Sequence, residues 1–255
     1  MTFYIKERLT DILNREMNIF LNMLEVMYKW NFELEEFECI ETSYVQYNRK
    51  KNLHLRGIKL KGADLSRVYL YRANLEKINL ERALLEGANL EEAILENVNL
   101  KGANLKDADL ESATLEGVNL EGANLKRVNL ERAKIRDVNL EGANMKRANL
   151  KGTNWKNENL KKVYLGGAIL EGASLENVNL EGANLKGANL KEANLVGALL
   201  NKVDLKGTNL KETIFDEKQV ELLYQTFNLY GCRVYLFETK AIISYKEYCV
   251  KNQKV

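Results

Sequence analysis

The hydrophobic positions of this chain recur every five residues, without a slip, from residue 58 to residue 217. Of the 32 large apolar positions between residues 60 and 215, 28 hold leucine, and the exceptions are Ile135, Met145, Trp155 and Phe215. Two residues before each of these central positions the side chain is usually small or β-branched, and the other three positions are polar. A short, unbroken period of this kind indicates a repeat architecture.

A period of five matches neither regular element alone, because helices repeat apolar residues every 3.6 positions and strands every two. We interpret each pentapeptide as a very short strand followed by a corner. Glycine supports the corner, since 14 of the 16 glycines stand two residues after a central position. A β-turn that needs positive φ at its third residue selects glycine there. The pattern therefore predicts such a turn at every corner.

A second, longer period gives the number of corners in one coil. The position two before the central residue holds a larger side chain every twenty residues, at Ile58, Ile78, Val98, Val118, Val138, Glu158 and Val178. Four pentapeptides therefore make one coil. Because neighbouring strands lie roughly 4.8 Å apart, about eight stacked coils would form a rod of about 38 Å. Leucine, alanine and valine should fill its interior and leave no room for a ligand.

The repeats resemble those of pentapeptide-repeat proteins, whose pattern is A(N/D)LXX. The pattern stands here as GANLE at 87–91 and GANLK at 102–106. The resemblance implies an all-β solenoid, a right-handed quadrilateral β-helix. For function it implies less: some family members resemble a DNA duplex, bind DNA gyrase or topoisomerase IV and protect them from quinolones, whereas most have no established role.

Composition argues against an extended DNA mimic. The chain carries 38 basic and 36 acidic residues, so it offers no overall negative field to a DNA-binding protein. Its three cysteines, Cys39, Cys232 and Cys249, are too few and too scattered for a disulfide framework or a metal cluster, which favours a cytoplasmic protein. Charged residues interrupt the apolar ones in residues 1–30, which excludes a secretory signal or a membrane span there.

The segments flanking the repeats (53–217) form two further units, 1–52 and 218–255. In the first, residues 3–30 predict an amphipathic helix or helix pair, and Phe37 to Tyr47 a lead-in strand. In the second, we expect a helix from Asp216 to Leu229 with Tyr224 on its packed side, then a hairpin of residues 233–237 and 241–243. Ser244 and Glu247 form a capping box for a last short helix.

The terminal segments have two interpretations. The ends of a solenoid expose an apolar coil edge, so these segments either cover it or join two copies of the chain. For the N-terminal helix we favour the covering role. For the C-terminal segment the covering role and the joining of two copies are nearly balanced. Outward apolar residues near the ends, such as Leu84 and Leu199, are expected to lie under these segments.

With twenty residues to a coil, each outward side chain can be assigned to a face of the rod. Basic and acidic residues then fall on different faces. A candidate basic stripe comprises Lys106, Lys126, Arg127, Lys146, Arg147, Lys186 and Lys206. A candidate acidic face comprises Glu76, Glu91, Glu96, Glu111 and Glu116. The columns are either solvated surface that keeps a repeat protein soluble or a binding stripe for an acidic partner, and the first is favoured.

One stretch, residues 153–170, departs from the pattern. Glu158 occupies an inward position, where a carboxylate must be neutralised, paired or turned outward. Trp155 enlarges a central position, and Tyr164 points out. Such irregularities mark either a functional site or, more often in repeats, sequence drift that the neighbours absorb.

No motif for catalysis, cofactor binding or metal binding occurs, and the single histidine, His54, lacks ligands at suitable spacing. An enzyme, a cofactor and a membrane association are therefore not expected. The favoured function is a rigid protein–protein interaction module with an unknown partner. The alternative is a DNA-mimic modulator of gyrase or topoisomerase IV, while direct nucleic-acid binding along the lysines is less favoured.

Overall fold

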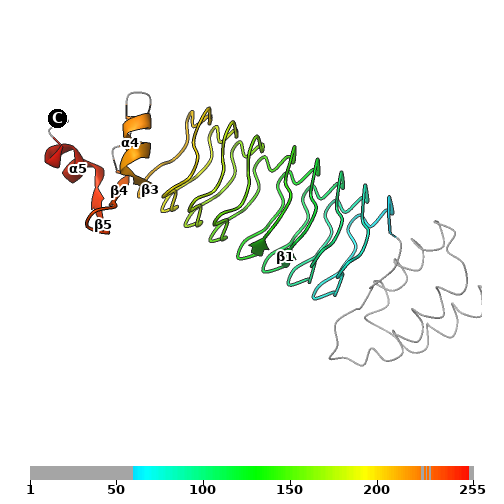
Figure 1. Cartoon of the computed structure of the whole chain (residues 1–255). Helices are drawn as coiled ribbons and strands as arrows, with labels where there is room; N and C mark the ends of the chain where they lie inside the picture. Colours follow the sequence, from blue (N-terminus) through cyan, green and yellow to red (C-terminus); the bar gives the residue numbers. More distant parts are fainter. Residues whose placement is uncertain (1–59, 225–226, 228, 230, 253–255) are drawn as a thin grey trace, which may run out of the picture.

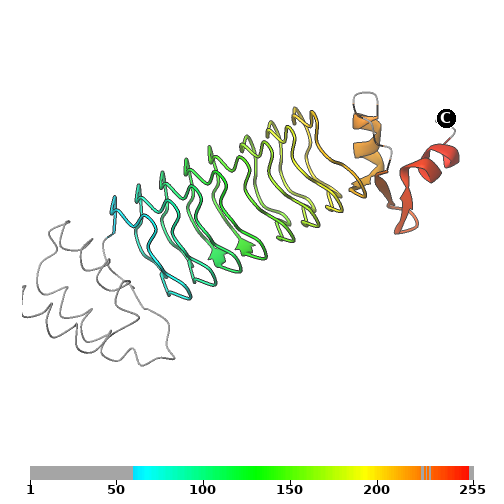
Figure 2. The same cartoon turned by 180° about the vertical axis from the view of Figure 1, so that it is seen from behind.

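The computed structural model describes residues 60–224, 227, 229 and 231–252. Within this part the chain winds into a solenoid whose coils stack along one rod, with the C-terminal elements at one end (Figures 1 and 2). The predicted N-terminal helix, the strand from Phe37 to Tyr47, Cys39 and His54 lie outside the described residues. No helix among the described residues is long and apolar enough to cross a membrane.

Hydrogen-bonded bridges confirm the twenty-residue coil. They join residues twenty apart in parallel, from Asp64 with Leu84 to Asn194 with Ile214. The strands are mostly single bridges, because each side of a coil is so short. Two longer strands, β1 (Thr114–Glu116) and β2 (Lys134–Arg136), pair in parallel in the same register. The chain is thus a β-solenoid with four pentapeptides in each coil.

The corners have the predicted positive φ. At one of them the N–H of Val68 donates to the carbonyl of Leu65 at 3.2 Å, and Arg67 between them has φ 58°. Gly122, at φ 63°, and Arg127, at φ 60°, adopt the same conformation. Glycine suits this position without being required there, because the corner side chains project into solvent.

The interior is closely packed. Stacked central residues such as Leu80, Leu100 and Leu120 have at most 2% of their surface exposed. The alanine and valine positions two residues earlier are equally buried, as at Ala83 and Val98. Side chains packed this closely exclude water from the interior. Most of the polar and charged side chains of the solenoid therefore lie on its outer surface.

The last coil passes into five elements. Strand β3 (Ile214–Asp216) leads into helix α4 (Glu217–Leu223), and strand β4 (Arg233–Leu236) then pairs in parallel with β3. Strand β5 (Ala241–Ser244) pairs antiparallel with β4, and helix α5 (Tyr245–Lys251) follows. The predicted hairpin is confirmed, as is the capping box of α5, in which the N–H of Glu247 donates to Ser244 Oγ at 3.2 Å.

Three expectations for the C-terminal segment are wrong. Helix α4 ends at Leu223 rather than Leu229, and the Tyr224 side chain is 44% exposed rather than packed. The described residues between Tyr224 and β4 are not helical, and β4 pairs with β3. Leu199, expected under this segment, is 52% exposed, because the segment pairs with the part of the last coil around residues 210–216 instead.

Candidate interaction surfaces on the solenoid

Asparagine ladders fix the corners from which the charged side chains project. Asn124 illustrates the pattern: its Oδ1 accepts from the N–H of Lys126 at 3.3 Å, and its Nδ2 donates to Asn104 Oδ1 in the preceding coil at 2.9 Å. The first bond holds the backbone of the corner, and the second ties successive coils together. Side chains that follow the ladder therefore leave the rod at the same place in each coil.

The basic stripe follows one edge of the solenoid. Lys126, Lys146, Lys186 and Lys206 occupy equivalent corners separated by multiples of twenty residues. Within the described part of the chain, no ion pair joins any of these four lysines or Arg147 to a carboxylate. The stripe thus presents unpaired positive charge in four coils, with the uncharged corner of Gly166 and Gly167 between Lys146 and Lys186.

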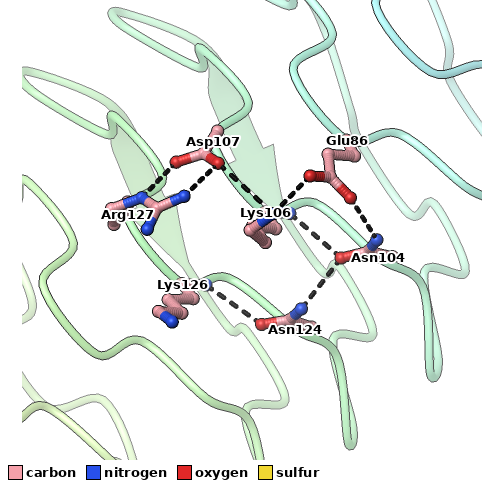
Figure 3. A network of polar contacts seen from close by, with 7 residues as sticks. All are labelled: Glu86, Asn104, Lys106, Asp107, Asn124, Lys126 and Arg127. Carbon is pink, nitrogen blue, oxygen red and sulfur yellow. Dashed lines mark hydrogen bonds and ion pairs between the residues drawn. The ribbon is translucent and has the colours of Figure 1, made fainter.

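Two members of the stripe, Lys106 and Arg127, are paired with carboxylates (Figure 3). Lys106 forms ion pairs with Glu86 and Asp107, and both Nε and Nη2 of Arg127 donate to the Asp107 carboxylate. The hydrogen bond from Arg127 lowers the pKa of Asp107, and the bond from Lys106 lowers the pKa of Glu86. The sequence-predicted stripe therefore contains two neutralised cations, and its other five members form its free part.

The candidate acidic face lies on two neighbouring corner columns. Glu76 pairs with Lys77 at 2.7 Å, and Glu116 pairs with Arg136 of the next coil. Glu91, Glu96 and Glu111 make no ion pair within the residues the structure describes. In the column of Glu76, Glu96 and Glu116, the next two coils have Arg136 and Lys156 before glutamate returns at Glu176, so the uninterrupted acidic band covers only the first part of the rod.

At Glu158 the series of backbone bridges between two successive coils is interrupted. In the described structure no bridge joins Lys134 with Asn154 or Asn139 with Asn159, whereas Tyr164 still bridges the coil before it. The Glu158 carboxylate takes the place of the missing carbonyls: Oε1 accepts from the N–H of Asp137 at 2.8 Å and Oε2 from the N–H of Val138 at 3.1 Å. Glu158 is half-buried and paired with backbone, one of the outcomes that its inward position requires.

The residues around Glu158 adapt to a large core side chain. Trp155 is 1% exposed, and its Nε1 donates to Thr153 Oγ1 at 2.7 Å. The Thr153 hydroxyl in turn donates to the carbonyl of Leu150. Tyr164, by contrast, is 57% exposed on another face of the same coil. The structure therefore separates the three sequence-predicted irregular residues: Trp155 and Glu158 lie at the opening, and Tyr164 lies apart from it.

Two buried polar residues that sequence analysis did not single out close the last coil. Gln219 Nε2 donates to the carbonyls of Leu195 and Ala198 at 2.7 and 2.9 Å, and Asp216 Oδ2 accepts from the N–H of Gly197 at 2.9 Å. Asp216 and Gln219 also form the capping box of α4. The sequence did contain a signal for these residues, because an Asp followed three positions later by a Gln is the spacing of a capping box.

The described residues show no group of three or more side chains placed to hold a metal ion. Cys232 is buried, its Sγ donates to the carbonyl of Leu210 at 3.1 Å, and burial raises the pKa of its thiol to about 12. A thiol held protonated in this way is a poor nucleophile at neutral pH. Charged side chains thus lie on the outer edges of the described solenoid, and apolar side chains fill its interior.

Comparison with known proteins agrees with the repeat geometry. The family model for pentapeptide repeats matches in eight copies that together span residues 52–216. No curated protein sequence matches the chain. Among solved structures, the chain is 31% identical to HetL, a pentapeptide repeat protein involved in heterocyst differentiation regulation in Nostoc sp. strain PCC 7120, with coverage of 69% of this chain and 95% of that one and a TM-score of 0.46.

Two other solved structures are similar to parts of the chain. A pentapeptide repeat protein from the Arabidopsis thaliana thylakoid lumen is 33% identical, over 38% of this chain and 67% of that one, with a TM-score of 0.37. The plasmid-mediated fluoroquinolone resistance protein QnrB1 is 17% identical, over 69% of this chain and 93% of that one, with a TM-score of 0.49. None of these matches indicates a catalytic family. The chain belongs to the pentapeptide-repeat family.

Proposed function

We propose that this protein is a rigid, non-enzymatic protein–protein interaction module that works in the cytoplasm. The observation that carries the proposal is the run of unpaired lysines along one edge of a solid rod. A packed interior offers no cavity for a substrate, and the corners hold the side chains at fixed intervals. Such a surface suits a partner that reads a spatial pattern of charge.

The proposal includes a particular architecture. We take the repeat domain, residues 53–217, as a right-handed quadrilateral β-helix of about eight coils, since strands stack about 4.8 Å apart. Residues 1–52 and 218–255 would cover its two ends. Gln219 supports this role for the C-terminal segment, because its side chain donates to the carbonyls of Leu195 and Ala198.

A test compares the free lysines with paired ones. One variant replaces Lys126, Lys146 and Lys186 by Gln, and the matched control replaces Lys61, Lys101 and Lys161, each of which pairs with a glutamate of the next coil. Both variants lose the same charge. With each protein as bait in lysate of the source cell, quantitative mass spectrometry should find a partner that the first variant loses and the control retains. Equal capture by all three proteins would contradict the proposal.

The acidic face supports a second candidate function, modulation of DNA gyrase or topoisomerase IV by local DNA mimicry. The observation in its favour is that Glu91, Glu96 and Glu111 are not neutralised by ion pairs in the described part of the chain. A gyrase supercoiling assay, with and without a quinolone, tests it. Inhibition or protection that is lost when Glu91, Glu96, Glu111 and Glu116 become Gln would support mimicry, and no effect at micromolar protein would reject it for gyrase.

A second copy of this chain is an alternative partner at the C-terminal end. Strand β5 lies at the edge of its sheet, and Phe237, Ile242 and Val250 nearby are 50%, 41% and 62% exposed. Sedimentation analysis would show a dimer that Ile242→Lys dissociates. A monomer at all concentrations would leave this segment with only its covering role.

A further inference from the structure

The coil formed by residues 153–172 differs from its neighbours on two adjacent faces. On one face Tyr164 stands between Asn144 and Asn184, and on the next Ile169 stands between Asn149 and Asn189. Tyr164 is 57% exposed and Ile169 41% exposed. Among the described residues between Leu84 and Leu199, these two are the only large hydrophobic side chains so exposed. Both replace an asparagine of the ladders that otherwise cover the middle of the rod.

The corner between these two side chains is bare. Gly166 and Gly167 occupy it, where the equivalent corner of the preceding coil has Lys146 and Arg147. Gly167 has φ 68°, and a Cβ built on it would lie 3.4 Å from Cγ of Arg147, so the aliphatic part of Arg147 lies beside the corner. Tyr164 and Ile169 thus flank an edge that has no side chains of its own and has the aliphatic part of Arg147 beside it.

This apolar corner lies inside the free part of the basic stripe. Lys146 and Arg147 precede it by one coil, and Lys186 follows it by one coil. The stripe corners at 126–127, 146–147, 166–167, 186–187 and 206–207 contain no carboxylate. Interfaces are strongest where a desolvated aromatic anchor is surrounded by polar groups that complement the partner. Here the surrounding groups are cations.

We propose that the edge formed by Tyr164, Gly166, Gly167 and Ile169 docks an acidic protein segment that carries a large apolar side chain. The apolar residue packs against Tyr164 and Ile169, and its flanking carboxylates lie along the stripe lysines. This inference rests on the proposed function as an interaction module and adds the site and the chemistry of the partner. The bare corner allows the partner backbone to approach closely.

A protein segment fits this edge better than a nucleic acid. Nucleic-acid single strands are held by several aromatic platforms in succession, and this edge has one. A duplex would also span the neighbouring corner column, where Glu111, Glu131 and Glu171 stand in line with Lys151 and Lys191 and Glu171 pairs with Lys191. That column has no excess of positive charge, so it adds little to the affinity that counterion release provides. A narrow peptide contacts the basic edge alone.

The test uses two fluorescein-labelled peptides of alternating Asp and Glu, one with a central Leu-Phe pair and one with Gly-Ser in its place. Fluorescence anisotropy with the full chain should show about tenfold tighter binding of the Leu-Phe peptide, equivalent to about 1.4 kcal/mol. The substitutions Tyr164→Asn and Ile169→Asn should abolish this difference. Asparagine is the residue that neighbouring coils carry at both positions, so the variants keep the repeat pattern. Leu199→Asn, on another face, should leave the difference intact.

Equal affinity for the two peptides, or a preference that survives Tyr164→Asn together with Ile169→Asn, would overturn the inference. So would a single-stranded oligonucleotide that binds more tightly than either peptide and depends on Tyr164. The outcome is separable from that of the proposed function. A cellular partner that is lost on replacing the free lysines but retained by the Tyr164→Asn variant would uphold the interaction module and reject this docking site.

Discussion

At the scale of single residues, the corner position sets a conformational requirement rather than a chemical one. Gly122 has φ 63°, a Cβ added there would meet no atom within 4 Å, and Arg127 adopts nearly the same φ five residues later. The left-handed conformation costs an ordinary residue roughly 1–2 kcal/mol, whereas asparagine is tolerated and a β-branched residue is strongly disfavoured.

We therefore expect Gly122→Asn to change the free energy of unfolding by less than about 1 kcal/mol and Gly122→Val to lower it by at least about 2 kcal/mol. Urea unfolding followed by circular dichroism would measure both. Similar losses for the two variants would mean that space, not backbone conformation, limits this corner.

Glu158 shows how one side chain can replace part of a backbone ladder. Its two oxygens accept from two N–H groups, and glutamine has only one oxygen to offer. We expect Glu158→Gln to lower the free energy of unfolding by about 1 kcal/mol, the usual contribution of one hydrogen bond. Glu141→Gln, the same change at an exposed position, serves as the control and should have little effect. An equal effect of both substitutions would mean that the bonds to Asp137 and Val138 contribute no stability.

At the scale of the element, helix α4 does more than follow the last coil. Its capping residue Asp216 accepts from the N–H of Gly197, so it joins the helix start to the solenoid. Solenoids are stabilised mainly by contacts between neighbouring coils, and damage at one end therefore stays local.

Asp216→Ala should cost about 0.5–2 kcal/mol at the helix start and release the Gly197 amide. Hydrogen exchange with mass spectrometry should show faster exchange in peptides covering residues 195–200 and unchanged exchange in the middle of the rod. Glu217→Ala, in the same helical turn, is the control. Unchanged exchange around Gly197 in the Asp216 variant would show that this contact does not hold the last coil closed.

At the scale of the whole molecule, ion pairs join successive coils at twenty-residue intervals. Lys61 with Glu81 at 3.0 Å and Lys161 with Glu181 at 2.8 Å are two of them. In each case the hydrogen bond from the lysine lowers the pKa of the glutamate. At these places a column of corner residues has opposite charges in successive coils. The charges therefore attract each other, whereas like charges in the same positions would repel.

These pairs predict an acid-sensitive rod. A carboxyl whose pKa is lower in the folded state stabilises that state above its unfolded pKa, and the contribution is lost as the pH falls through the folded value. We expect stability to be constant from pH 7 to about 5 and to fall below about pH 4, where glutamate protonates. High salt should reduce the size of the fall, because exposed pairs are screened. Urea midpoints measured across this range test the prediction, and a fall beginning above pH 5 would contradict it.

The sequence by itself determined the solenoid, its twenty-residue coil, the buried positions and the corner conformation. Each of these features follows from the surroundings that a residue has in every pentapeptide. About thirty copies of the pentapeptide define the register of the repeat without ambiguity. The capping box of α5 could also be predicted from the sequence, because Ser244 and Glu247 are three residues apart and interact locally. Local and repeated interactions are the ones that a single sequence encodes directly.

The tertiary structure alone decided which charges are free and where the ladder opens. Lys106 and Lys126 occupy identical slots in the sequence pattern, yet Lys106 is paired with Glu86 and Asp107, because pairing depends on the side chains of adjacent coils. The end of α4 and the exposure of Leu199 depend on the path of the chain back to β3. The opening at Glu158 likewise required the positions of Asp137 and Val138 in space, twenty residues away along the chain.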